Sequence, residues 1–158
     1  MIEKMKINEF VRKYWPLGLL LVLILSLILL KTGLPQPGKR YKMYFYSYDS
    51  EKYCRETRIL PKNPVQGREK AFVDELLLGP FTNRYKRIFA RGTKTLFCIV
   101  ENDTIFVNLS KEALQNSGEN ADILKSIELF RKNILKNFKN INTVELYIDS
   151  VYVPETEN

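Results

Sequence analysis

One short segment of the chain combines positive charge with aromatic rings in a way that suits binding. Between residues 83 and 91 (NRYKRIFAR), cationic side chains interleave with Tyr85 and Phe89. Such a mixture can hold a phosphate or glycan chain, or stack on bases. The competing interpretation is a solvated connection whose Ile88 and Phe89 pack on the core. If the segment contacts a ligand or a partner, the residues expected to do so are Arg84, Tyr85, Lys86, Arg87 and Arg91.

Residue types that carry catalysis or bind metals are scarce. The chain contains no histidine, which excludes Ser-His-Asp and Cys-His catalysis and histidine metal ligation. The spacing of its two cysteines matches no zinc motif, and no glycine-rich phosphate loop occurs. Two carboxylate pairs are expected on a surface helix and at a hairpin tip, which does not suit a glycosidase; they are Asp74 with Glu75 and Glu101 with Asp103. We therefore predict a non-enzymatic protein without a metal or cofactor.

The two cysteines admit two interpretations. Cys54 and Cys98 would be able to form one disulfide if the domain is exported to an oxidising compartment. Alternatively, Cys98 lies in the apolar run of residues 96–100 and is a small core residue, as free cysteine commonly is.

An apolar block near the N-terminus bears on where the chain resides. Residues 17–30 (LGLLLVLILSLILL) carry no charge, and only Ser26 is polar. About 20 helical residues cross the hydrocarbon core of a bilayer. Residues 14–34 reach this length if Lys31 extends its ammonium group to the headgroups. No small-residue cleavage motif follows, and the first cysteine is Cys54, so the sequence favours an uncleaved transmembrane anchor over a removed signal peptide or a lipidated N-terminus.

The flanks of this span define the remaining organisation. A short basic tail, residues 1–13, precedes the span, and a Pro/Gly linker, residues 35–40, follows it. The numbers of Lys and Arg on the two sides nearly balance, so orientation depends on the short tail. A short tail favours a single-pass protein of the cytoplasmic membrane whose C-terminal part lies outside the cytoplasm. That part is expected to be one domain, residues 41–153, with a flexible tail, residues 154–158.

Hydrophobic periodicity predicts the elements of this domain. Gly79, in the left-handed conformation, and Pro80 are expected to end the first helix, and Ser110 to cap a short turn over residues 111–114. The order β-β-α-β-β-α-β indicates an α/β fold in which one mixed sheet has two helices packed on one face. Strands are predicted at 41–48, 57–60, 93–100, 104–109 and 143–149, and helices at 68–78 and 123–138.

Two further features concern partners. The stripe formed by Tyr44, Tyr46 and Tyr48 and the exposed strand edges are candidate contact surfaces, although tyrosines of a strand also serve in core or cross-strand packing. The net charge is +7, but the positive side chains are too dispersed to indicate nucleic-acid binding.

Four sequence features occur in the order and spacing of a known family. They are residues 72–80 (FVDELLLGP), residues 92–96 (GTKTL), a hairpin ending in residues 105–110 (IFVNLS), and a closing strand, residues 144–149 (VELYID). Together they resemble the GerMN domain, a sporulation and germination module, over roughly residues 43–150. Asn108 stands where that family often has aspartate, and the segment 83–91 is more basic than usual.

The resemblance implies a small α/β domain, related in shape to the ring-building motifs of sporulation assemblies and commonly tethered to the envelope. It implies no catalytic residues. We therefore expect a membrane-anchored, non-catalytic envelope module that acts in protein–protein or cell-wall assembly, in which homo-oligomers are one form of contact. The alternative is a peptidoglycan- or glycan-binding or regulatory subunit of a cell-wall enzyme.

Overall fold

The computed structural model describes residues 2–33, 38–49, 52–115 and 122–155. The chain divides into two compact units, residues 1–36 and 37–158. The predicted linker and C-terminal tail therefore lie partly outside the described residues.

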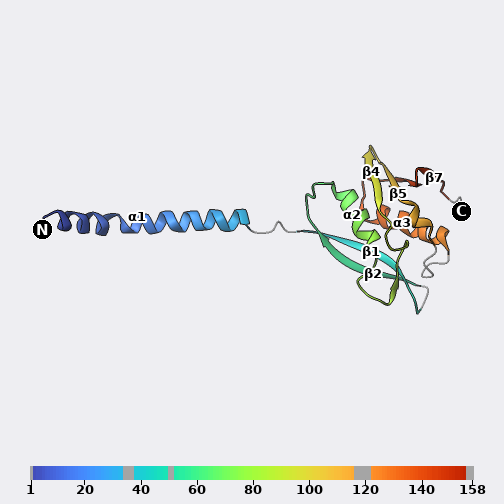
Figure 1. Ribbon diagram of the computed structural model, residues 1–158, viewed down its shortest axis with the longest axis horizontal. Helices are drawn as coiled ribbons and strands as arrows, with labels where there is room; N and C mark the ends of the chain where they lie inside the picture. The colour runs from blue at the N-terminus through green and yellow to red at the C-terminus, as the bar shows by residue number, and fades with distance from the viewer. Residues whose placement is uncertain (1, 34–37, 50–51, 116–121, 156–158) are drawn as a thin grey trace. The chain divides into compact units, whose positions relative to one another are not determined.

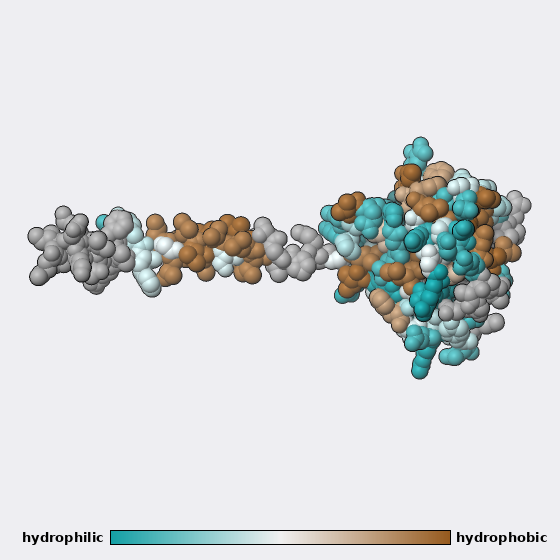
Figure 2. Space-filling model, in the orientation of Figure 1, coloured by the Kyte–Doolittle hydropathy of each residue, from teal (hydrophilic) through white to brown (hydrophobic). Residues whose placement is uncertain are grey.

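The first unit is a single helix, α1, over Ile2–Gly33. Its stretch Lys13–Leu30 is long and apolar enough to cross a membrane, by length and composition, and none of it is buried within the structure. Figure 2 shows this stretch as a band of hydrophobic residues. Because apolar side chains occupy all sides of the helix, no single face is available for packing on a domain core.

The described residues of the second unit form seven strands in two sheets (Figure 1). The three-stranded sheet is antiparallel and has the order β2-β1-β3, with β1 at Lys39–Ser47, β2 at Tyr53–Leu60 and β3 at Tyr85–Lys86. The four-stranded sheet has the order β4-β5-β6-β7, with β4 at Thr95–Glu101, β5 at Thr104–Leu109, β6 at Thr143–Ile148 and β7 at Val151–Val153. Strands β5 and β6 are parallel, and the other pairs in this sheet are antiparallel.

The prediction of one mixed sheet is therefore wrong. Strand β1 pairs with β2 along one edge, and its other edge is occupied by β3 at Tyr46 and Ser47 and by side chains of helix α3 at Lys42 and Tyr44. No edge of β1 remains for joining the strands of the second sheet. The short strands β3 and β7 were not predicted, because two or three residues are too few to show a period.

Two asparagines of helix α3 (Ile123–Asn137) take the place of a neighbouring strand along β1. Asn133 accepts a hydrogen bond from the Tyr44 N–H (2.8 Å) and donates to the Tyr44 carbonyl oxygen (2.9 Å). Asn137 makes the same pair of bonds with Lys42, at 2.9 and 2.7 Å. Four residues of helix and two of strand both advance by about 6 to 7 Å, so the two amides match alternate residues of β1. This part of the β1 edge is consequently closed, which corrects the expectation of an exposed contact edge there.

One core unites both sheets with helices α2 (Arg68–Leu77) and α3. Helix α3 contacts β1 of one sheet and β6 of the other, whereas α2 contacts β4. The rings of Tyr41, Phe72 and Phe138 pack with centres 5.3 to 5.7 Å apart. The predicted helical and alternating patterns are confirmed as the buried faces; members of this core include Met43, Phe45, Val73, Leu76, Ile105, Val107, Leu109, Ile127, Phe130, Ile134, Val144, Leu146 and Ile148.

Ser110 precedes a 3₁₀ turn, η1, at Lys111–Leu114, as the sequence predicts. Its hydroxyl does not cap that turn, however. It accepts a hydrogen bond from the Lys94 N–H (3.0 Å), while the Ser110 N–H donates to the Lys94 carbonyl oxygen (2.9 Å). Ser110 thus continues the pairing of β5 with the segment that precedes β4.

The cysteines are free and belong to different sheets, Cys54 to β2 and Cys98 to β4. Cys98 packs against the core, and burial raises its pKa to about 12. This partly buried position agrees with the interpretation of Cys98 as a small apolar residue of the core. A hydrogen bond with Cys54 raises the pKa of Tyr85.

Helix α2 ends where the sequence predicts, because Gly79 adopts the left-handed conformation (φ 84°). A Cβ atom at Gly79 would lie 2.7 Å from a guanidinium nitrogen of Arg87 and 2.9 Å from its Cγ. We expect Gly79→Val to lower the free energy of unfolding by more than about 1 kcal/mol, through left-handed strain and this clash. Thermal denaturation measures the loss.

Gly92→Val is the matched control. Gly92 has nearly the same φ (88°), but a Cβ atom added there would meet no atom of a non-adjacent residue within 4 Å. Gly92→Val should therefore lose only the part of the free energy of unfolding that comes from left-handed strain. An unchanged melting temperature in Gly79→Val would contradict the assignment of the helix end.

Candidate functional site

Four tyrosines gather on the outer face of the three-stranded sheet. Alternation along β1 turns Met43 and Phe45 into the core and leaves Tyr44 and Tyr46 on the other face. Tyr46 lies opposite Tyr53 of β2, with ring centres 4.8 Å apart and hydroxyl oxygens 3.1 Å apart. Tyr48, which follows β1, is exposed. The predicted tyrosine stripe is therefore at the surface and gains a fourth member from β2.

Lysines from two other elements lie over these rings. The Nζ atom of Lys132 is 4.1 Å from the ring centre of Tyr53, and that of Lys136 is 4.6 Å from that of Tyr44. Lys86 of β3 lies 5.5 Å from the ring centre of Tyr48. We call these residues the tyrosine–lysine face: Tyr44, Tyr46, Tyr48, Tyr53, Lys86, Lys132 and Lys136.

The lysines of this face keep their charge available. Within the part of the chain that the structure describes, no carboxylate forms an ion pair with Lys86, Lys132 or Lys136. Contact with an aromatic ring restricts each ammonium group without neutralising it. The arrangement therefore leaves positive charges on this face that are positioned but not neutralised.

The tyrosine hydroxyls supply hydrogen-bond donors on the same face. Burial, the hydrogen bond with Tyr53 and the negative charges of Glu128 and Asp122 all raise the pKa of Tyr46. Tyr46 is consequently a neutral phenol at physiological pH. In the Tyr46–Tyr53 pair one hydroxyl donates to the other, which leaves one proton to donate outward.

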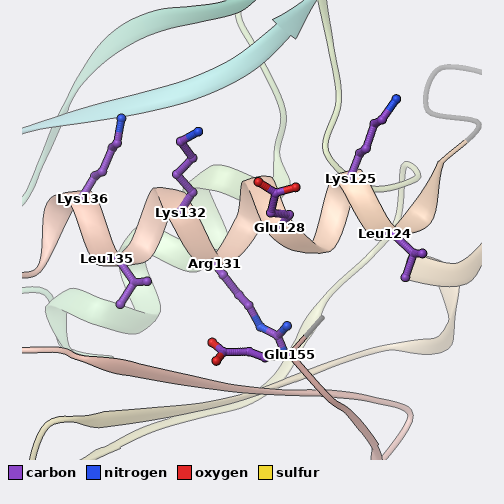
Figure 3. Close-up of a pocket in the computed structure, with 8 residues that line it drawn as sticks. All are labelled: Leu124, Lys125, Glu128, Arg131, Lys132, Leu135, Lys136 and Glu155. Atoms are coloured by element: carbon purple, nitrogen blue, oxygen red, sulfur yellow. The ribbon is translucent and has the colours of Figure 1, made fainter. Parts of the chain in front are cut away.

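Two of the lysines also border a groove along helix α3 (Figure 3). Lys125, Glu128, Lys132 and Lys136 extend to one side of the helix, and Arg131 extends to the other, where Glu155 lies. The groove has a volume of about 540 Å³ and is lined by Leu124, Lys125, Glu128, Arg131, Lys132, Leu135, Lys136 and Glu155.

Arg131 has a structural role in this groove. It is 7% exposed and donates to the carbonyl oxygens of Val153 (2.6 Å) and Pro154 (3.1 Å). These bonds hold the chain that follows β7 beside α3. The other charged side chains that line the groove are Lys125, Glu128, Lys132, Lys136 and Glu155.

The side chains of the predicted contact segment, residues 83–91, lie in different places in the structure. Lys86 joins the tyrosine–lysine face, whereas Tyr85, the preceding residue of β3, lies beside Cys54. Arg84 adjoins the face through its carbonyl oxygen, which accepts a hydrogen bond from the Tyr48 N–H (3.0 Å). Ile88 and Phe89 are buried, as the interpretation of a connection docked on the core predicted; the two are 2% and 5% exposed.

Arg87 and Arg91 lie elsewhere. Arg87 donates a hydrogen bond to the Leu78 carbonyl oxygen at the end of α2, where a cation also complements the helix dipole. Together with Arg91 it lines a separate hollow that includes Asp74 and Lys94. The five predicted contact residues therefore do not form one site.

Sequence reasoning missed Tyr53, Lys132 and Lys136. These lysines lie in the predicted helix 123–138, and no pattern in the sequence links them to tyrosines that lie 79 or more residues earlier. A signal existed in the repeated Lys-Asn pair at residues 132–133 and 136–137. Its asparagines bind the edge of β1 and thereby bring the adjacent lysines over the tyrosines.

The fold defines a class of protein: a small two-sheet α/β domain, here with a face of tyrosines and lysines on its three-stranded sheet. Among the described residues, no group of three or more His, Cys, Asp or Glu side chains is placed to hold a metal ion. Residues 42–151 match the Germane family, described as "Sporulation and spore germination". The chain belongs to this family, which confirms the resemblance to the GerMN domain.

Individual relatives are distant. An uncharacterised lipoprotein of Treponema pallidum (strain Nichols) is 24% identical over 96 residues, which cover 61% of this chain and 72% of that protein. The tandem GerMN domains of the sporulation protein GerM from Bacillus subtilis align with a TM-score of 0.57 and 17% identity, over 73% of this chain and 41% of that one. The first GerMN domain of the same protein aligns with a TM-score of 0.54 and 18% identity, over 71% and 85%. This chain thus spans less than half of the tandem structure, and the likeness shows the fold.

Proposed function

We propose that this chain is a membrane-anchored, non-catalytic module of the cell envelope that acts by contact with envelope proteins or the cell wall, in a sporulation- or germination-type role or another envelope process. The observation that carries the proposal is the tyrosine–lysine face. Its lysines are held over aromatic rings and have no ion-pair partner among the described residues. A face of this kind favours an acidic partner.

The helix α1 supports the anchoring part of the proposal. The Treponema relative is named a lipoprotein, whereas the first cysteine of this chain is Cys54, inside the folded domain on β2. The apolar stretch Lys13–Leu30 would supply through a helix the membrane attachment that a lipid supplies in a lipoprotein. In the proposed topology, the C-terminal domain lies outside the cytoplasm.

The surroundings of the carboxylates support a role without catalysis. Asp74 pairs with Lys70 (2.7 Å) on the surface of α2, and Glu75 binds Arg58. Asp103 accepts a hydrogen bond from the Asn142 side chain (3.0 Å) next to the β4–β5 turn. The carboxylates of Asp74, Glu75 and Asp103 are thus engaged in local ion pairs and hydrogen bonds that hold the surrounding structure.

The anchoring part is tested by fractionation and topology. The full chain should sediment with membranes, be released by detergent, and give an active alkaline phosphatase when this enzyme is fused to its C-terminus. A chain that stays in the supernatant, or an inactive fusion, would overturn it.

The contact part is tested by charge reversal on the face. A photoreactive amino acid at Thr57, an exposed position on the same side of β2 as Tyr53, should crosslink the native chain to neighbours in cells. We expect the combined change Lys86→Glu, Lys132→Glu and Lys136→Glu to abolish most of this crosslinking, because attraction becomes repulsion.

The matched control is Arg91→Glu, Lys94→Glu and Lys111→Glu, which reverses three exposed cations that are not part of the face. This variant should retain the crosslinks, and circular dichroism should show both variants folded. Equal crosslinking by the two triple variants would count against the face as the contact surface.

A peptidoglycan- or glycan-binding or regulatory subunit of a cell-wall enzyme is the second candidate. A row of rings on the four-stranded sheet favours it: Phe97, Tyr147 and Tyr152 lie in register, with centres 6.3 and 5.4 Å apart. Such rings can stack on the apolar faces of sugars. Muropeptide binding by the monomer that Tyr152→Ala abolishes would favour this function, whereas concentration-dependent self-association would favour assembly.

A further inference from the structure

The chain enters the domain at a well-defined corner. Lys39, the first residue of β1, pairs with Leu60, the last residue of β2, and Arg40 pairs with Ile59. Gly38 lies so close to β2 that an added Cβ would be 2.3 Å from Cγ2 of Ile59 and 2.8 Å from the Leu60 carbonyl oxygen. We call residues 38–40 and 59–68 the entry corner.

Two aliphatic side chains project into solvent at the entry corner. Ile59 is 64% exposed, and Val65, in the loop between β2 and α2, is 106% exposed. Proline at 61 and 64 restricts this loop, and the Gly67 N–H donates to the Pro64 carbonyl oxygen (3.1 Å). Val65 is thus presented on a loop of fixed course, without apolar neighbours to cover it.

Positive charge surrounds these side chains. Lys39, Arg40, Lys62 and Arg68 are all exposed at the entry corner. Within the described residues, one of these four cations has an ion-pair partner: Arg68 lies 3.8 Å from the carboxylate of Glu69. Exposed aliphatic groups among several cations are the combination that binds the interface of an anionic bilayer.

The length of the connection to α1 brings such an interface within reach. The apolar stretch ends at Leu30, and α1 ends at Gly33. Residues 34–38 then lead to β1, and five extended residues span at most about 18 Å. A bilayer that holds α1 therefore lies within a few tens of ångströms of the entry corner, whatever the path of the linker.

We propose that the entry corner binds the anionic lipid surface of the membrane. Val65 and Ile59 enter the boundary between headgroups and acyl chains, and Lys39, Arg40, Lys62 and Arg68 contact lipid phosphates. The proposal rests on the anchoring role of α1 proposed above. It adds a second contact with the membrane, made by the domain itself.

The test places a fluorescent reporter at the corner. The full chain, with its single tryptophan removed by Trp15→Phe, is reconstituted in nanodiscs that contain lipids brominated near the headgroup. With Val65→Trp, we expect blue-shifted emission and quenching in anionic nanodiscs, and loss of both in neutral ones. Adding Lys39→Glu, Arg40→Glu and Lys62→Glu should abolish the quenching in anionic nanodiscs as well.

Ile99→Trp is the matched control, since Ile99 is 58% exposed on β4 of the other sheet. It should remain unquenched in every nanodisc. Equal quenching at both positions would mean that the domain only tumbles near the lipid, and absent quenching at residue 65 would mean that the corner does not bind; either result overturns the inference. A chain that fails to enter nanodiscs at all would instead refute the proposed anchoring.

Discussion

Replacing Arg58 with alanine is expected to lower the free energy of unfolding by about 3–5 kcal/mol, because its carboxylate partners lose their compensating charge in a largely dry site. Arg58 is 3% exposed and donates to Glu75 Oε1 (2.6 Å), Glu56 Oε2 (3.2 Å) and the Gly79 carbonyl oxygen (2.6 Å). Its guanidinium carbon also lies 3.6 Å from the ring centre of Phe81. One side chain therefore joins β2 to the end of α2 and to the loop that follows. Urea denaturation measures the loss.

Arg55→Ala provides the comparison. Arg55 is an exposed cation on the same strand, so its removal should change the free energy of unfolding by no more than about 0.5 kcal/mol. Equal losses in the two variants would contradict the structural role of Arg58.

The same cluster predicts a pH dependence. Burial by itself would raise the pKa of Glu56, but hydrogen bonds from the N–H groups of Phe81 and Thr82 and from Arg58 outweigh burial and lower it below 4.5. A folded-state pKa below the unfolded value means that the stabilisation is present above about pH 4.5 and is lost as the pH falls through the folded value. In Arg58→Ala the free energy of unfolding should therefore depend less on pH below 4.5.

The second large effect is expected at Asn133. Its side chain is 0% exposed and forms three hydrogen bonds, two with the backbone of Tyr44 and one with the Leu129 carbonyl oxygen (2.9 Å). Asn133→Ala leaves the Tyr44 N–H and carbonyl groups without these partners. We expect a loss of about 2–4 kcal/mol in the free energy of unfolding.

Asn137→Ala is the natural comparison, because Asn137 makes the same bonds one helical turn later at a position that is only partly buried. Water can replace its amide, so the loss should be about 1 kcal/mol. Hydrogen exchange should show faster opening of the Tyr44 amide in Asn133→Ala. Equal destabilisation by the two substitutions would show that burial of the Asn133 amide adds nothing to the free energy of unfolding.

The sequence was most informative where burial is periodic. The apolar spacing of Ile127, Phe130 and Ile134 predicted α3, and the alternation of Ile105, Val107 and Leu109 predicted β5. The division into two sheets was not predictable in this way, since it depends on Asn133 and Asn137, whose polar side chains read as surface positions. The buried amide of Asn133 finds its partners only in the folded chain.

Only the tyrosines of the candidate site that lie on or next to β1 could be predicted from the sequence. Tyr44, Tyr46 and Tyr48 were recognised, because alternation within a strand is a local property. The lysines over them come from β3 and α3, and only tertiary contacts bring these elements to β1. Arg87 of the segment 83–91 lies away from this face because its guanidinium group binds the Leu78 carbonyl oxygen at the end of α2.

The two asparagines of α3 that bind the edge of β1 also limit where another strand can join this sheet. With β3 only two residues long and the rest of that side bound to amides, β2 is the flank that offers a long row of backbone groups to an incoming strand. Joining two copies through β2 would consume that flank in both. Growth of the three-stranded sheet from this flank would therefore end at a closed pair.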